Sequence, residues 1–298
     1  MKKSEYLALP EVSSFVQWFR SLLNGSVTTV FKHSYLIEAK GTSRVQVPWS
    51  CTSIFNAFEN YEWRFSYTDY FTEQKVIGHS YIQSASSLDS LRFQLRDAVR
   101  NGDNERCYLV CCMILKWGGV LGSEVKGNKR SLCVLKPYLT DYLQAIQDYF
   151  NASPELSSRY EVQFKGRVEK IRMNAGYTKI YALLCDDFII YDGRVGGALG
   201  LLVRLYLDSV TDRKYDKVPE YIAFYYGKAK NNKVNRNPSK DNYVFRSLSN
   251  QAAVHIRNNI KANWIVSALD LTDQTEFSKQ QDPFRAIEAA LFMIGYKI

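Results

Sequence analysis

The sequence has few of the residues from which metal sites are built. Its three histidines, at positions 33, 79 and 255, are far apart, and no two cysteines form a C-x-x-C pair. This scarcity makes a zinc site improbable, and we expect no metal and no cofactor. We expect the cysteines to be reduced and mostly buried, because no secretion signal is visible. The cysteines are Cys51, Cys107, Cys111, Cys112, Cys133 and Cys185.

The sequence also lacks a long apolar run. The longest candidate, residues 196–207, is interrupted by Arg204 and is too short to span a membrane. The first residues, Met1-Lys2-Lys3-Ser4-Glu5-Tyr6, do not lead into an apolar signal-peptide core. We therefore expect a cytoplasmic protein with no membrane partner.

Nucleotide-binding motifs are missing as well. No G-x-x-x-x-G-K-[ST] sequence occurs, and the glycines at 193, 196, 197 and 200 do not fit G-x-G-x-x-G. The chain does not alternate strands with helices as a doubly wound fold does. A nucleotide-binding enzyme is thus a disfavoured alternative, which a titration with ATP or NAD would test.

What the sequence does contain is positive charge and aromatic side chains. The 298 residues include 39 Lys+Arg against 30 Asp+Glu, a net charge of +9, and 46% of them are hydrophobic. Such a chain can bury a core, and its charge favours an anionic partner, most commonly nucleic acid. A basic enzyme unrelated to nucleic acid is the competing interpretation of the charge alone.

The hydrophobic pattern predicts a mainly α fold with a minor β portion near the N-terminus. We expect an aromatic-rich α/β region at residues 1–85, with a strand or two within 28–39, and a helical core at residues 86–298. Gly118-Gly119 and the pair Asp282-Pro283 mark one helix end and one helix start. The expected helices begin near residue 88 and then cover 105–117, 137–150, 177–185, 195–207, 251–269 (amphipathic) and 283–294.

One lysine lies where it could act as a nucleophile. A short loop containing Gly176 leads into an apolar helix, and Lys179 falls near the start of that helix. Burial disfavours the charged ammonium form of a lysine, and a neutral amine can attack carbon. The alternative is a structural lysine whose stem packs on the helix while its head reaches water.

An aspartate follows Lys179 by 13 positions. An extended apolar run ends at Asp192, and a glycine-rich helix follows, so Asp192 is predicted to cap that helix. A capping carboxylate stays ionised and presents a fixed negative charge.

The order of these features resembles the helix-hairpin-helix DNA glycosylase superfamily, most closely its oxoguanine-glycosylase branch. Thr178-Lys179 matches the end of the family's hairpin, and Asp192 matches the aspartate at the start of the next helix. The family hairpin usually has two glycines around one apolar residue, whereas this chain has one, Gly176. The spacing from Lys179 to Asp192 is also shorter than in the best-known relatives.

The shortened form, with Asp192 inside the sequence Tyr-Asp-Gly-Arg-Val, resembles a bacterial group with the oxoguanine-glycosylase fold. Residues 116–119, residues 236–239 and the helix that contains His255 and Trp264 are similar to that group as well. No cysteine follows Cys185. The iron–sulfur ligand set of other superfamily members is therefore missing.

The resemblance implies a two-lobed helical fold and a monomer that binds double-stranded DNA with one base flipped out. It implies that Lys179 attacks the sugar, after which the strand could be cleaved, or that Lys179 only assists a water nucleophile, as in a pure glycosylase. In both cases Asp192 stabilises positive charge on the sugar. The implied DNA-binding residues are Gly176, Thr178, Arg172, Arg194, Lys228, Lys230, Lys233 and Arg236. The residues expected to line a base pocket are Trp117, Tyr177 and His255.

Several alternatives stay open at this point. General burial statistics favour a core role for Trp117 over a role in a base pocket. The basic loop 228–240 either neutralises DNA phosphates or is an ordinary solvated loop. The excised base is a hypermodified base of phage DNA, such as a modified cytosine, or else oxidised guanine, and antiphage relatives favour the first. A non-catalytic DNA-binding module is the remaining alternative.

Overall fold

The computed structural model describes residues 1–26, 31–38, 46–157, 159–210, 215–229, 231, 233–271 and 275–298. Most of its regular structure is helical, and the named strands form three two-stranded antiparallel sheets. This confirms the expected mainly α class. One of the three strand pairs, at residues 161–170, lies beyond the N-terminal portion where strands were expected. The elements are α1 (Lys3–Leu7), α2 (Pro10–Leu23), β1 (His33–Glu38), β2 (Gln46–Cys51), α3 (Ile54–Glu59), β3 (Phe65–Thr68), β4 (Lys75–Gly78), α4 (Tyr81–Arg100), α5 (Asn104–Trp117), α6 (Asn128–Leu135), η1 (Lys136–Tyr138), α7 (Leu139–Asn151), β5 (Glu161–Phe164), β6 (Arg167–Lys170), α8 (Tyr177–Leu184), α9 (Gly193–Ser209), η2 (Glu220–Ile222), α10 (Ala252–Ser267), η3 (Glu276–Lys279) and α11 (Pro283–Ile294).

The chain divides into two compact units, each assembled from separate segments. Unit 1 contains residues 1–3, 62–191 and 250–260, and unit 2 contains residues 4–61, 192–249 and 261–298. Residue 85, where the sequence suggested a boundary, lies inside unit 1. The two units are described one after the other below.

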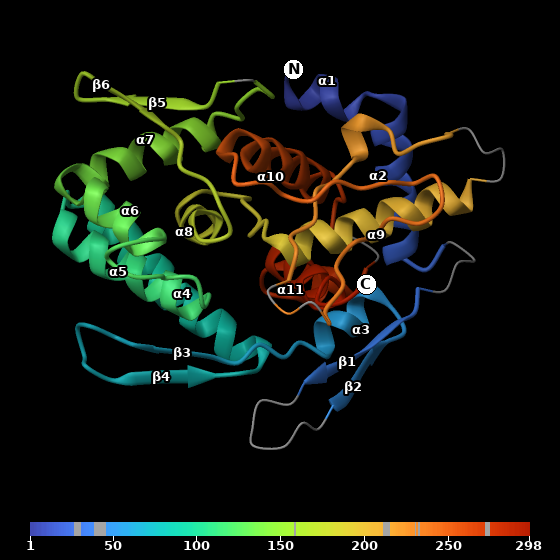
Figure 1. The fold of residues 1–298 in the computed structure, drawn as a ribbon, viewed down its shortest axis with the longest axis horizontal. Coiled ribbons are helices and arrows are strands. Elements are labelled where there is room, and N and C mark those ends of the chain that lie inside the picture. The colour runs from blue at the N-terminus through green and yellow to red at the C-terminus, as the bar shows by residue number, and fades with distance from the viewer. Residues whose placement is uncertain are drawn as a thin grey trace. The chain divides into compact units, whose positions relative to one another are not determined.

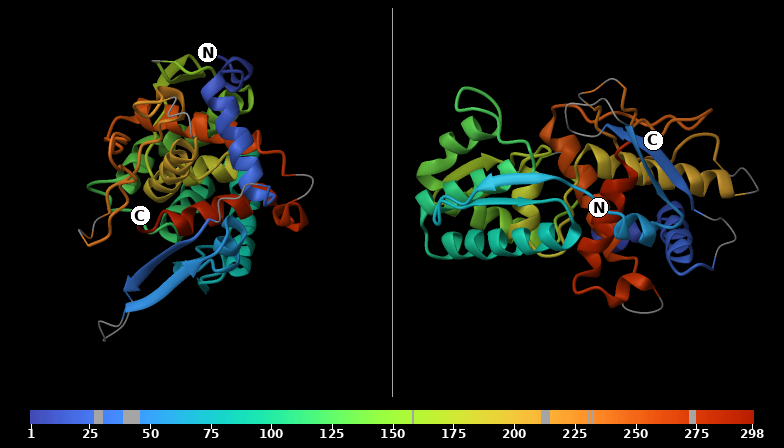
Figure 2. Two further views of the ribbon diagram at one scale, coloured as in Figure 1. Left: turned by 90° about the vertical axis from the view of Figure 1, so that its right-hand side faces the viewer. Right: turned by 90° about the horizontal axis from the view of Figure 1, so that it is seen from below.

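Unit 1 surrounds the short helix α8. Helices α4, α5 and α7 all contact α8, which Figure 1 shows end-on among them. Every side chain of α8 is buried, so this helix lies in the core of the unit. The β3–β4 hairpin packs on α5 and β5–β6 packs on α7. Figure 2 (right) shows β3 and β4 running along the helical part of this unit.

Unit 2 is organised around α9, which contacts α2 and α11, while α11 also packs on α3. The β1–β2 hairpin adds an aromatic cluster to this core. Tyr35 stacks on Trp49 at a centroid distance of 4.6 Å and on Tyr296 at 5.2 Å. The Tyr35 hydroxyl donates to the Met293 carbonyl at 2.7 Å, so the hairpin is tied to α11.

Local signals in the sequence explain several of the helix boundaries. Asp282 accepts a hydrogen bond from the Arg285 N–H at 2.9 Å, which confirms the expected cap of α11. Helix α5 begins at a capping aspartate, Asp103, and ends at Gly118, as Gly118-Gly119 predicted. Of the strand region predicted at 28–39, residues 33–38 form β1, while 28–30 and 39 lie outside the described residues.

The prediction that α10 is amphipathic is wrong. Its apolar residues Ile256, Ile260 and Trp264 are buried, but so are four polar ones. These polar residues are His255, Asn258, Asn259 and Lys261. The helix therefore passes through the core, where hydrogen bonds to distant segments satisfy its polar side chains.

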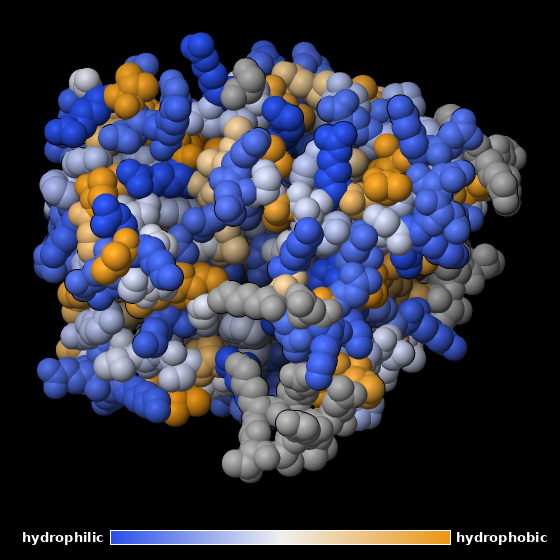
Figure 3. Space-filling view, viewed as in Figure 1, coloured by the Kyte–Doolittle hydropathy of each residue, from blue (hydrophilic) through white to orange (hydrophobic). Residues whose placement is uncertain are grey.

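The cysteines are free thiols, and all but the exposed Cys133 are buried, as expected. No helix among the described residues combines the length and apolar character needed to cross a membrane. The face drawn in Figure 3 is mostly polar, with apolar residues in scattered groups.

Candidate functional site

Lys179 lies in the first turn of α8 and is buried, with 5% of its surface exposed. Its Nζ donates a hydrogen bond to the Ala175 carbonyl at 2.8 Å. The structure therefore does not show the alternative, in which the charged end of the lysine side chain reaches water. A buried ammonium needs polar partners, and a backbone carbonyl is one of them.

The loop before α8 is closed by an asparagine that we did not single out in the sequence. Asn174 Oδ1 accepts the N–H of Gly176 at 2.7 Å and that of Tyr177 at 3.1 Å. Asn174 Nδ2 in turn donates to Asn128 Oδ1 at 2.8 Å. The hairpin N–H groups, which the resemblance would offer to a DNA phosphate, are thus occupied within the protein. Asn is a common residue for such local capping, which is the signal that could have identified Asn174.

Gly176 is a glycine because of its neighbours. Its φ of −87° is open to any residue, but an added Cβ would lie 2.8 Å from Asn128 Cγ and closer still to Asn128 Nδ2. The same Cβ would lie 2.9 Å from Leu115 Cδ2. Gly176 therefore allows the loop to pack tightly against α5 and α6.

Tyr177 and Arg172 belong to one hydrogen-bonded group. The Tyr177 hydroxyl lies 2.6 Å from Ser131 Oγ, and Arg172 Nη1 donates to the same Oγ at 2.8 Å. The Tyr181 hydroxyl donates to the Arg172 carbonyl at 2.7 Å, and the Arg172 N–H donates to the Tyr142 hydroxyl at 2.9 Å. Burial raises the pKa values of Tyr177 and Tyr181, so their hydroxyls remain protonated.

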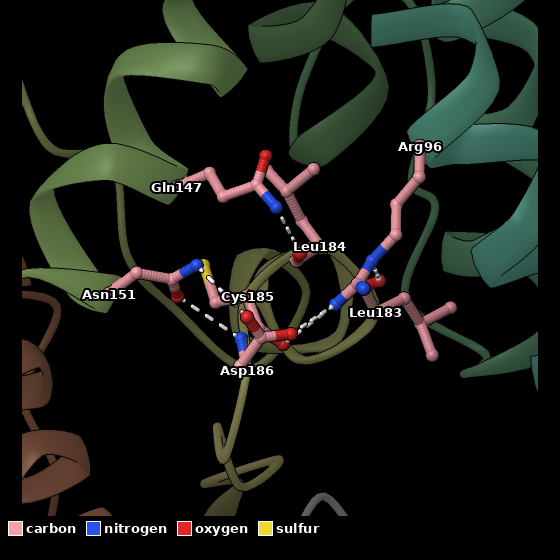
Figure 4. Close-up of polar contacts among 7 residues, drawn as sticks. All are labelled: Arg96, Gln147, Asn151, Leu183, Leu184, Cys185 and Asp186. Atoms are coloured by element: carbon pink, nitrogen blue, oxygen red, sulfur yellow. Dashed lines mark hydrogen bonds and ion pairs between the residues drawn. The ribbon is translucent and has the colours of Figure 1, made fainter. Parts of the chain in front are cut away.

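The C-terminal end of α8 is held by side chains from α4 and α7 (Figure 4). Arg96 donates to the Leu183 carbonyl at 3.2 Å and to the Cys185 carbonyl at 3.3 Å. Gln147 Nε2 donates to the Leu184 carbonyl at 3.0 Å. The last carbonyls of a helix have no hydrogen-bond donor within it, so the Arg96 and Gln147 side chains act as the missing donors.

Asp186, directly after this end, completes the arrangement in Figure 4. It pairs with Arg96 Nη2 at 2.9 Å, and its other carboxylate oxygen accepts from Asn151 Nδ2 at 3.2 Å. The Asp186 N–H donates to Asn151 Oδ1 at 3.1 Å. Both ends of the helix that bears Lys179 are consequently fixed.

The segment between α8 and α9 is anchored to α10. Thr178 Oγ1 donates to Asn259 Oδ1 at 2.8 Å and accepts the Tyr191 N–H at 2.9 Å. Asn259 Nδ2 donates to the Ile189 carbonyl at 3.1 Å, and His255 Nε2 lies 2.6 Å from the Tyr191 carbonyl. Thr178 is fully buried, so its observed role is to bond the inside of unit 1. Asn259 was not predicted as a site residue. The signal that could have identified it is its position four residues after His255, on the same face of the helix.

Asp192 begins unit 2 and caps α9, as predicted. Its Oδ1 accepts the N–H of Arg194 at 2.8 Å and that of Val195 at 3.2 Å. Lys179 and Asp192 thus fall in different units, and Asp192 directly follows Tyr191 in the chain.

Two arginines predicted to bind DNA lie near Asp192. The Arg194 guanidinium packs over the rings of Phe292, at 4.2 Å, and Tyr296, at 4.8 Å. Arg236 Nε donates to the Tyr296 carbonyl at 3.2 Å. Burial lowers the pKa of both arginines while the Asp192 charge raises it.

The basic loop 228–240 begins where the chain touches the start of α9. Gly227 donates its N–H to the Gly193 carbonyl at 3.1 Å, and a Cβ on Gly193 would lie 2.6 Å from Gly227 Cα. Glycine at both positions permits this approach of two backbones. Lys228 and Lys233 are exposed, and Lys230 lies outside the described residues.

All three residues expected to line a base pocket, Trp117, Tyr177 and His255, are buried within unit 1. Trp117 is 6% exposed and packs against Phe65 at a centroid distance of 6.2 Å, which agrees with the core interpretation. His255 is held by the Tyr191 carbonyl as described above.

Among the described residues, no group of three or more His, Cys, Asp and Glu side chains could hold a metal ion. No family model matches the chain, and no curated protein or solved structure matches it significantly.

Proposed function

We propose that this chain is a DNA N-glycosylase of the helix-hairpin-helix type, which flips a modified base out of double-stranded DNA and excises it. The observation that carries the proposal is the buried Lys179 at the start of α8, with its amine on the Ala175 carbonyl. A lysine in such surroundings is held at a defined position, and after loss of a proton its amine is a competent nucleophile at carbon.

The proposed role of Lys179 is attack on the sugar carbon that carries the base. The amine forms a bond to this carbon, and the base leaves with the electron pair of the broken bond and takes up a proton. The sugar then remains bonded to the Lys179 nitrogen, which loses a proton while the bond from C1′ to the ring oxygen breaks and that oxygen takes up a proton. The ring-opened sugar is now a Schiff base on Lys179, which water hydrolyses or from which the 3′ phosphate leaves by β-elimination. Asp192 supplies negative charge for the positive charge that develops on the sugar.

Exposed lysines such as Lys228 and Lys233 would contribute phosphate contacts. Arg194 and Arg236 are partly buried, and we assign them the support of Asp192. Thr178, being fully buried, is assigned a positioning role. Among substrates we favour a hypermodified base of phage DNA, such as a modified cytosine, over oxidised guanine.

The experiment is borohydride trapping on DNA from phages with different base chemistry and on duplexes that contain oxidised guanine. Trapping reduces the Schiff base to a stable protein–DNA adduct, and abasic sites are scored in parallel. We expect an adduct with the wild type and none with Lys179→Met. DNA binding without adduct or abasic sites on any substrate would instead favour a non-catalytic DNA-binding module.

Lys261 provides a matched control. Like Lys179, it is 5% exposed and places Nζ on backbone carbonyls, those of Ala223 at 2.8 Å and Glu220 at 3.3 Å. Lys261→Met therefore also removes a buried ammonium, and we expect it to leave trapping intact. Equal loss of trapping in the two variants would show that the effect is a general one on folding.

A further inference from the structure

Two consecutive glycines follow α5, and the structure gives them different reasons to be glycine. Gly119 has φ +66°, a conformation that side chains other than Asn and Asp rarely adopt. Gly118 has φ −76° and ψ −2°, which every residue adopts. Backbone conformation thus explains Gly119 but leaves Gly118 unexplained.

The space around Gly118 supplies the explanation. A Cβ at this position would lie 2.6 Å from Lys179 Cε and closer still to Lys179 Cδ. The next nearest atom, Val120 Cγ2, would be at 3.5 Å, which is an ordinary contact. The stem of Lys179 is therefore the one group that severely obstructs a side chain at position 118.

The far end of the same lysine is fixed as well, since Nζ donates to the Ala175 carbonyl at 2.8 Å. The stem passes over the Gly118 backbone and the amine ends at the loop that precedes α8. The Gly118 N–H donates to the Ile114 carbonyl at 3.0 Å, so the surface over which the stem passes belongs to a well-formed helix end.

We infer that Gly118 is a positioning residue for the Lys179 amine: the missing side chain at position 118 is what allows the lysine stem its observed course. The position of the amine does not depend on the proposed function; only the expected effect of Gly118 on activity rests on it. A methyl group at 118 would push aside the flexible stem more easily than the backbone, so the fold is kept and the amine is displaced. Misplacement of a reacting group by about 1 Å can lower a rate by about a hundredfold.

The first test is a double-mutant cycle in thermal unfolding, which needs no substrate. Gly118→Ala is made in the wild type and in Lys179→Ala, where the obstructing stem is gone. We expect a lower unfolding temperature in the wild-type background and no loss, or a small gain, in Lys179→Ala. The same loss in both backgrounds would overturn the inference.

The second test follows the amine itself. Lys179 is labelled with formaldehyde and borohydride, and its methylation rate is measured by mass spectrometry in the wild type and in Gly118→Ala. We expect a changed rate at Lys179 and an unchanged rate at Lys261. Gly119→Asn is the control variant, because Asn tolerates this backbone conformation and a Cβ at 119 meets nothing within 4 Å. An unchanged Lys179 rate in Gly118→Ala would contradict the inference.

The third test uses the DNA that the wild type processes. Gly118→Ala should reduce borohydride trapping by about a hundredfold while DNA affinity stays the same, and Gly119→Asn should do neither. Unchanged trapping would overturn the inference. If the wild type traps no DNA while the first two tests succeed, then the proposed function fails and the positioning of the amine by Gly118 stands.

Discussion

Thr178 and Asn259, 81 residues apart in the chain, are joined by a buried hydrogen bond of 2.8 Å between Oγ1 and Oδ1. It links the helix that bears Lys179 to α10. The same Thr178 hydroxyl accepts the N–H of Tyr191, the residue before Asp192. The Thr178 side chain, next to Lys179, therefore also holds the residue next to Asp192.

Thr178→Val keeps the shape of the side chain but removes the hydroxyl. We expect it to lower the free energy of unfolding by about 1–3 kcal/mol, because the buried Tyr191 N–H and Asn259 amide lose a partner. Urea unfolding measures this loss. Thr178→Ser retains the hydroxyl and should lose less, so an equal loss in both variants would mean that packing of the methyl group dominates.

Arg96→Met removes the two hydrogen bonds from Arg96 to the end of α8 (Figure 4). We expect the last turn of α8 to exchange its amide hydrogens faster and the free energy of unfolding to fall by about 1–2 kcal/mol. Hydrogen exchange read by mass spectrometry checks the first effect. Arg100→Met is the matched control, since Arg100 lies one turn further on α4 and is exposed. Similar exchange in the two variants would contradict the role of Arg96.

Substitutions at Asp192 can separate its cap from its charge. Asp192→Asn keeps an oxygen for the Arg194 and Val195 N–H groups but removes the charge beside Arg194 and Arg236. We therefore expect a smaller loss of stability than in Asp192→Ala, together with a strong loss of base release. Asp192→Ala removes both functions and should also cost about 0.5–2 kcal/mol of stability. Thermal unfolding and an abasic-site assay provide the two readouts. Full base release by Asp192→Asn would remove Asp192 from the mechanism.

His33 should make unit 2 less stable in mild acid. Burial lowers the pKa of His33 below its usual 6.5, and its bond to the Lys297 carbonyl offsets this only in part. The unfolded chain then binds the proton more readily, so stability present above pH 6.5 is lost as pH falls below 6.5. The slope for one proton is at most about 1.4 kcal/mol per pH unit.

His33→Gln should flatten this dependence in urea unfolding between pH 7 and pH 5. His79→Gln, which changes an exposed histidine, should leave the slope as it is. If the free energy of unfolding of His33→Gln depended on pH as steeply as that of the wild type, other groups would be the cause of the acid sensitivity.

The sequence was informative where a structural signal is local. The caps Asp192 and Asp282, and the glycines that end α5, placed α9, α11 and α5 correctly, because a cap and its helix are neighbours in the chain. The burial of Lys179 could be anticipated from its apolar flanks for the same reason.

The contacts that surround the candidate site could not be anticipated in this way. His255 was expected to line a base pocket, and Asn259 was not singled out, whereas in the structure they contact Tyr191 and Thr178. The contact of Gly118 with the Lys179 stem joins two helices and has no local signature. Gly176 was predicted to offer its N–H to phosphate, but the neighbouring Asn174 accepts it. Tertiary partners decided each of these cases.

The interleaving of the two units bears on how the chain folds during synthesis. Most of unit 1 is one continuous stretch, residues 62–191, which can begin to collapse as soon as it leaves the ribosome. The early segment of unit 2, residues 4–61, packs with α9 and α11, which are made much later. Helix α3 and the β1–β2 hairpin must therefore wait, with their apolar faces uncovered, until α11 arrives. We therefore expect chaperones to bind the growing chain mainly within residues 4–61.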